Sequence, residues 1–156
     1  EREGIGFDGT IASDSAPLHT LVRAMLDADR NAGIRCMRDP TRGGLASSLN
    51  EIAARAKVGM ELNESAIPIR EEVRGACEML GLDPLYVANE GKLVAVVAPE
   101  AVDSVLAAMN AHDLGKEAWV IGTVTPKHPG LVTARTPFGT TRIVDMLSGD
   151  QLPRIC

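Results

Sequence analysis

Short apolar runs alternate with amphipathic stripes along most of this chain, and this alternation restricts the folds open to it. Residues 92–98, Lys-Leu-Val-Ala-Val-Val-Ala, form the clearest apolar run and predict a buried strand. Residues 18–26 instead repeat their apolar side chains at helical spacing, which predicts a helix to about residue 29 with Ser15 as its N-cap. Further helices are predicted from about 43 to 58, over 70–80 with Gly81 as the stop, and after Pro99; further strands are predicted at 34–37, 60–62 and 118–124, with a hairpin of 131–136 and 140–145. The pattern predicts an α+β domain with helices packed on a mixed β-sheet.

Composition narrows the functional classes. The 156 residues are 45% apolar and 24% charged, which is typical of a globular domain with its own core. A net charge of −5 and only 3% aromatic residues argue against a nucleic-acid partner. No window approaches the roughly 20 apolar residues of a membrane span, and no signal peptide is visible. Three widely spaced cysteines fit a cytoplasmic protein, three scattered histidines predict no metal site, and the start at Glu1 suggests a fragment or processed product.

The strongest internal cluster follows the strand at 34–37 and precedes a helix. Its candidate ligand-binding residues are Asp39, Thr41, Arg42, Gly43 and Gly44. Two glycines let the backbone approach a ligand, the helix N-terminus favours an anion, and the arginine can bind phosphate in a bidentate manner. The aspartate could bind Mg²⁺ or cap the turn. The alternative is an ordinary structural turn, and the Gly-Lys-Ser/Thr ending of a P-loop is absent.

A second cluster stands before the best strand candidate. Asn89, Glu90 and Lys92 place an amide, a carboxylate and an amine together, which suits acid–base chemistry. The alternative is a polar turn whose side chains point to water. Arg142, after the turn at 137–139, could likewise face either a ligand or the solvent.

The chain ends in Pro153-Arg154-Ile155-Cys156. A terminal thiol can be carried to another site, and the neighbouring arginine favours the reactive thiolate. The alternative is an ordinary frayed end that happens to carry a cysteine. Cys36 and Cys77 lie among apolar neighbours and are predicted to be core thiols.

These pieces together resemble the C-terminal half of one family of hydrogenase maturation factors, the carbamoyl dehydratases known as HypE. The resemblance rests on stretches that keep the family's order over nearly the whole chain. They are residues 38–46, 50–51, 66–70, 73–77, 86–92, 138–142 and 153–156.

The resemblance implies the fold of the aminoimidazole ribonucleotide synthetase and selenophosphate synthetase superfamily, whose C-terminal domain is partly ferredoxin-like. Residues 1–146 would form this single α+β domain, and 147–156 a mobile tail. ATP and Mg²⁺ would be held mainly by an N-terminal domain that the chain lacks. Through that domain the full-length protein would form a homodimer.

The resemblance also implies the chemistry. A carbamoyltransferase would place a carbamoyl group on Cys156, and ATP-dependent dehydration would convert it to a thiocyanate. The cyanide would pass to iron on other maturation scaffold proteins, for the nickel–iron hydrogenase active site. Glu90 would act as the base, with Asn89 and Lys92 orienting groups or charge. The loop from Asp39 to Gly44 would line the nucleotide cavity.

Two other functions fit the same residues. A different ATP-dependent synthetase or kinase of this fold would use the glycine loop but leave the terminal cysteine idle. A non-catalytic docking domain would present its helices and tail to maturation partners.

Overall fold

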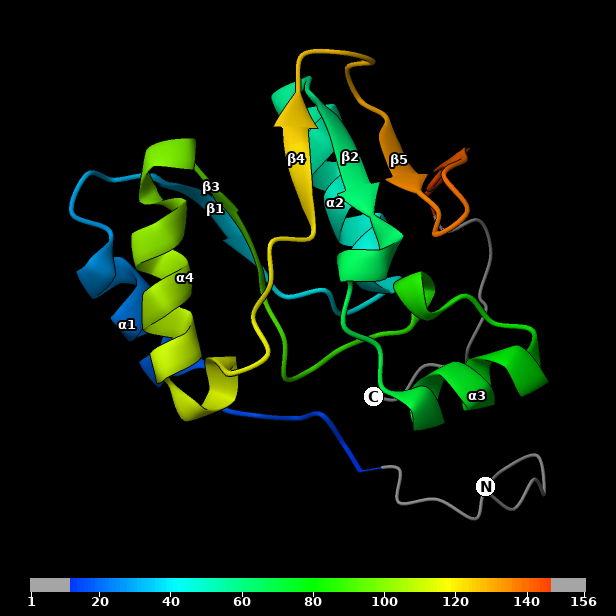
Figure 1. The fold of residues 1–156 in the computed structure, drawn as a ribbon, viewed down its shortest axis with the longest axis horizontal. Coiled ribbons are helices and arrows are strands. Elements are labelled where there is room, and N and C mark those ends of the chain that lie inside the picture. Colours follow the sequence, from blue (N-terminus) through cyan, green and yellow to red (C-terminus); the bar gives the residue numbers. More distant parts are fainter. Residues whose placement is uncertain (1–11, 147–156) are drawn as a thin grey trace.

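The computed structural model describes residues 12–146, and within them helices and strands alternate (Figure 1). In chain order the helices and strands are α1 (His19–Ala28), β1 (Ile34–Arg38), α2 (Gly44–Ala56), β2 (Gly59–Asn63), α3 (Glu71–Leu80), β3 (Val94–Val97), α4 (Val102–Ala111), β4 (Gly122–Thr125), β5 (Val132–Arg135) and β6 (Thr141–Ile143). Short 3₁₀ turns include η1 (Glu64–Ala66) and η2 (Pro84–Tyr86). The described helices are all too short or too polar to span a bilayer.

Strand pairing produces a mixed sheet, which confirms the predicted fold class. Four strands lie in the order β4-β2-β5-β6, and β2 runs parallel to β5 while the other neighbours are antiparallel. The predicted hairpin is the β5–β6 pair. A separate antiparallel pair of β1 and β3, which the sequence did not predict, lies beside this sheet.

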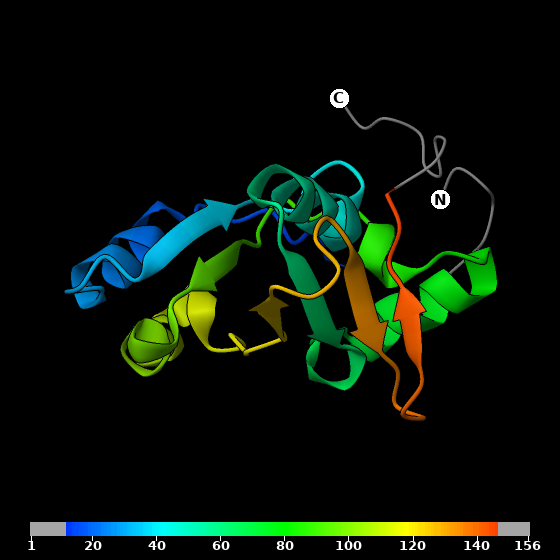
Figure 2. The same ribbon diagram turned by 90° about the horizontal axis from the view of Figure 1, so that it is seen from above.

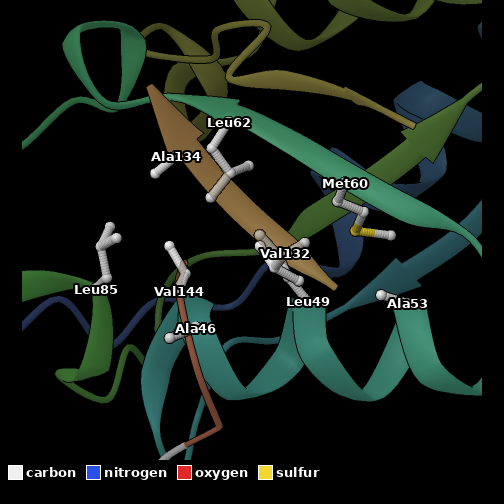
Figure 3. Packing of buried hydrophobic residues seen from close by; sticks show 9 residues of the cluster. All are labelled: Ala46, Leu49, Ala53, Met60, Leu62, Leu85, Val132, Ala134 and Val144. Carbon is white, nitrogen blue, oxygen red and sulfur yellow. The ribbon is translucent and has the colours of Figure 1, made fainter. Parts of the chain in front are cut away.

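Helix α2 covers one face of the four-stranded sheet and forms the larger core. Leu49 and Ala53 from the helix meet Met60 and Val132 from the two parallel strands (Figure 3). Leu85, Val144 and Ala46 gather at the other end of the cluster (Figure 3). This cluster therefore joins the helix, the sheet and the η2 turn.

A second, smaller core lies between α1, α4 and the two-stranded sheet. Leu21 and Met25 of α1 pack with Ala101 and Val105 near the start of α4. Apolar residues of β1 and β3 pack against this group from the sheet. Figures 1 and 2 show these elements at one end of the molecule and the four-stranded sheet with α2 toward the other.

Several predicted boundaries needed correction. The first helix begins at His19 after Leu18, without a side-chain cap, so Ser15 is not its N-cap. The strand predicted at 118–124 starts only at Gly122, because Ala118 still donates a turn hydrogen bond to Gly115 O at 3.0 Å. Strand β3 is half-buried, because it belongs to a sheet of two strands. Gly81 does end α3 in the left-handed conformation, at φ 67°.

The α1–α4 core can be tested by truncating Met25, which is fully buried at 0% exposure. Met25→Ala should lower the free energy of unfolding by about 2–5 kcal/mol, because it removes apolar contacts and leaves a cavity. Leu26→Ala is the matched control: the neighbouring side chain is 49% exposed, and its loss should cost about 1 kcal/mol or less. Urea unfolding measures the free energy of unfolding of both variants. Equal decreases for Met25→Ala and Leu26→Ala would contradict this packing.

Candidate functional site

The Gly43-Gly44 turn is shaped by close backbone packing. Both glycines have positive φ, 72° and 61°, and Gly44 N–H donates to Thr41 O at 2.9 Å. A β-carbon on Gly44 would lie 2.5 Å from Leu85 O and 2.6 Å from Val87 O. Glycine is therefore required here for approach to the protein's own backbone, whereas the sequence pointed to approach by a ligand.

A hydrogen bond joins the two predicted loops. Asn89 N–H donates to Pro40 O at 3.0 Å, so the 39–44 loop and the 87–92 loop lie side by side. The Asn89 side chain donates from Nδ2 to Val87 O at 2.8 Å, which fixes the orientation of its amide. Two segments that are separate in the sequence are thus neighbours in the structure.

Asp14 is a site residue that the sequence analysis missed. Its Oδ2 accepts hydrogen bonds from Glu90 N–H at 3.2 Å and from Lys92 Nζ at 3.0 Å. Its own backbone crosses Gly91 so closely that a β-carbon there would lie 1.5 Å from Asp14 O. Gly91 was the signal for this contact, but a glycine does not identify what approaches it.

Hydrogen bonding makes Asp14 a stronger acid. Partial burial opposes ionisation, but the hydrogen bond and charge of Lys92, together with the N–H groups of Gly91 and Glu90, outweigh it. The pKa of Asp14 therefore lies below its ordinary value.

The remaining predicted residues of the first loop differ in exposure. Asp39 and Arg42 are exposed, and Thr41 is half-buried. Asp39 also lines a hollow of about 240 Å³ whose walls include Leu18, Val22 and Leu93. Arg42 directly precedes Gly43, the residue before the first turn of α2.

A metal ion is not supported by the chain's own carboxylates. Across residues 12–146, no group of three His, Cys, Asp or Glu side chains is placed to hold one. The described residues therefore form no metal site made of protein side chains alone.

Arg142 serves neither of its two predicted purposes. Its guanidinium forms ion pairs with Glu64 and with Asp83, the latter at 2.9 Å. Burial disfavours the charge, but the two carboxylates outweigh it and raise the pKa of Arg142. The side chain thus ties β6 to the segments that contain η1 and η2.

The two thiols that the structure describes differ in burial. Cys77 is buried, and burial followed by the charge of Asp83 raises its pKa, which confirms a core thiol. Cys36 is only half-buried and lies outside both core clusters, so the prediction of a core thiol was wrong for it. Cys156 and the predicted tail 147–156 lie outside the described residues.

Comparison with known families assigns the chain. Residues 1–133 match the model of the family described as "AIR synthase related protein, C-terminal domain". The chain belongs to this family.

Relatives of this AIR synthase related domain sharpen the comparison. The chain is 60% identical over 156 residues to a carbamoyl dehydratase HypE from Rhizobium leguminosarum bv. viciae, covering 100% of the chain and 44% of the relative. It is 59% identical over 155 residues to one from Azotobacter vinelandii, covering 99% and 45%. The HypE resemblance is confirmed, and the chain spans less than half the length of these relatives.

Solved structures agree. The fold matches a hydrogenase maturation protein HypE with TM-score 0.90 at 42% identity, over 99% of this chain and 50% of the other. A HypE solved with ATP matches with TM-score 0.89 at 41% identity, over 99% and 47%. A HypE–HypF complex matches with TM-score 0.87 at 42% identity, over 94% and 47%.

The Asp14 contact predicts a pH-dependent contribution to stability. Because the folded-state pKa is depressed, this contribution is present above the unfolded-state pKa and is lost as pH falls through the folded-state pKa. Asp14→Asn should therefore lower the free energy of unfolding at pH 7 by about 1 kcal/mol or less, since the pair is half-exposed, and by less still at strongly acidic pH.

Urea unfolding of both chains at pH 7 and at acidic pH measures this difference. Asp27→Asn is the control, since Asp27 is exposed and pairs only with Arg23 of its own helix among the described residues. If Asp14→Asn lowered the free energy of unfolding as much at acidic pH as at pH 7, the depressed pKa of Asp14 would be contradicted.

Proposed function

We propose that this chain is the C-terminal half of an ATP-dependent carbamoyl dehydratase that acts in hydrogenase maturation. The observation that carries the proposal is a match to relatives of that name over 99–100% of the chain at 59–60% identity. The similarity to a HypE solved with ATP supports ATP as the co-substrate. The similarity to a HypE within a HypF complex supports a carbamoyltransferase of that kind as the partner.

The proposed reaction occurs on Cys156. The partner transfers a carbamoyl group to its sulfur. The amide oxygen then attacks the γ-phosphorus of ATP, ADP departs, and one N–H proton is lost. Cleavage of the C–O bond releases phosphate, loss of the second N–H proton completes the nitrile, and the sulfur carries a thiocyanate. The cyano group is then passed to iron on a maturation scaffold protein: the Fe–C bond forms as the S–C bond breaks, the iron centre supplies the two electrons, and Cys156 returns to the thiolate.

The described residues support a division of roles in this reaction. Glu90 presents an exposed carboxylate from a loop that Asp14 holds through the Glu90 N–H, which suits a base that removes a proton from nitrogen. Lys92, partly balanced by Asp14, supplies positive charge beside it. Asn89 is oriented by Val87 and can align the carbamoyl group.

The 39–44 loop supports the nucleotide side of the proposal. Arg42 is exposed beside the positive N-terminal end of α2, and phosphoryl transfer depends on positioning and charge neutralisation. We assign it, with Asp39, Thr41, Gly43 and Gly44, to the lining of the nucleotide cavity, which the other half of the protein completes.

Removal of Cys156 tests the reaction directly. The complete two-domain protein, mixed with its carbamoyltransferase, carbamoyl phosphate and ATP, should gain one carbamoyl group and then lose one water when hydrolysable ATP is present. Cys156→Ala should abolish both mass changes because it removes the accepting sulfur. Intact-protein mass spectrometry measures them.

Cys36→Ala is the matched control, since it removes a half-buried thiol and should leave both changes intact. Identical mass changes in Cys156→Ala would exclude this cysteine. ATP consumption without any change on the protein would favour a synthetase or kinase, and partner binding without ATP consumption would favour a docking domain.

The role of Glu90 is tested by Glu90→Gln, which keeps the shape of the side chain but removes the base. Dehydration of the carbamoylated protein should slow by about 10²–10⁴-fold, while carbamoylation by the partner continues. Single-turnover mass spectrometry measures both steps. Glu72→Gln, an exposed position on α3, is the control. A dehydration rate unchanged in Glu90→Gln would refute the assignment.

A further inference from the structure

Residues 142–145, which lead to the C-terminal segment, are held by polar contacts from three other segments. Arg142 binds Glu64 and Asp83, Asn50 Nδ2 donates to Val144 O at 2.9 Å, and Tyr86 OH donates to Asp145 O at 3.0 Å. We propose that Tyr86 and Asn50 are positioning residues that fix the base of the C-terminal segment relative to the 87–92 loop. The inference rests on the proposed function, because it concerns delivery of Cys156.

The Asn50 contact holds the base from the side of α2. Asn50 is 8% exposed, and its Nδ2 also donates to Ala46 O at 2.9 Å within the helix. Val144 is fully buried, and its own N–H donates to Val132 O at 2.9 Å. Both backbone polar groups of Val144 are thus bound, and its position follows α2 and β5.

The Tyr86 contact reaches one residue further along the chain. The ring of Tyr86 packs against the larger core, while its hydroxyl binds the Asp145 carbonyl. Burial, then the charge of Asp83, raises the pKa of Tyr86, so the phenol keeps its proton and donates. Met146 is the last residue that the structure describes.

The segment that contains η2 and Tyr86 continues directly into the candidate catalytic loop, residues 87–92. Asp83 binds Arg142 through Oδ2 and Leu85 N–H through Oδ1, which fixes the η2 turn to β6. Val87 O then orients the side chain of Asn89, whose backbone N–H binds Pro40. Tyr86 lies only four residues before Glu90. The segment that begins with η2 therefore both holds Asp145, where the C-terminal segment starts, and carries Glu90, the candidate proton acceptor.

Fixing this point matters because Cys156 reacts as a tethered group. The ten residues after Met146 span at most about 33–36 Å. The effective concentration of a tethered group depends on where its tether begins, and productive orientation depends on it too. Releasing Asp145 should therefore lower delivery to the loop without changing nucleotide binding.

The test uses the complete two-domain protein, carbamoylated on Cys156 by its carbamoyltransferase, with ATP added to start a single turnover. Tyr86→Phe keeps the packed ring and loses only the hydroxyl. At saturating ATP it should slow dehydration about three- to tenfold, the range for one lost hydrogen bond. The ATP concentration for half-maximal rate and the extent of carbamoylation should stay unchanged. Thr136→Val, which removes the 2.7 Å contact to Thr140 in the β5–β6 turn, is the matched control.

A second arm separates positioning from a general structural effect. Inserting Gly-Ser-Gly-Ser after Met146 uncouples the C-terminal segment from its base, so Tyr86→Phe in that background should add less than about a twofold change. The inference is overturned if Tyr86→Phe alone leaves the rate within twofold, if its effect persists in the lengthened chain, or if half-saturation by ATP shifts. If the natural protein carbamoylates but never dehydrates, the proposed function itself fails, and that outcome is distinct from all of these.

Discussion

The contact between Gly44 and the backbone of residues 85–87 is the constraint on which the candidate site depends. No side chain fits there, because a β-carbon would meet Leu85 O at 2.5 Å and Val87 O at 2.6 Å. The contact sets the buried first turn of α2 beside two carbonyl oxygens. Because residues 85–87 lie against Gly44, Asn89 follows close enough for its N–H to donate to Pro40 O. The neighbouring position of the two loops therefore depends on the contact at Gly44.

Most helices and strands could be predicted because burial follows the apolar period of each element. Val105 and Met25 are fully buried where helical spacing places them, and Gly81 ends α3 as a C-cap glycine does. The errors came from segments whose structure is set by distant partners. Ser15 has the composition of an N-cap, but the chain there lies against Gly91, and the helix begins only after Leu18. β1 (Ile34–Arg38) pairs with β3 (Val94–Val97) between residues that are 56 to 63 positions apart, so the pairing leaves no local signal in the sequence.

The residue types of the site could be read from sequence, but their partners could not. Asp14 stands 76 positions from Glu90, and nothing near it marks it as the carboxylate that holds the loop. Arg142 follows a turn, so the sequence left open whether it faces a ligand or the solvent. In fact Glu64 and Asp83, 78 and 59 positions away, neutralise it. Long-range ion pairs of this kind depend on the assembled fold, so composition near the residue carries no information about them.

The candidate site lies on the connections between the two cores. One loop leads from β1, in the smaller core, to α2, in the larger one; the other leads from η2 back to β3 (Figure 1). The Asn89–Pro40 hydrogen bond ties these two connections together, and the segment around Asp14 contacts the second of them. The geometry of these loops therefore depends on the packing of both cores, whereas buried Val144 and Asn50 hold the start of the C-terminal segment to the larger core.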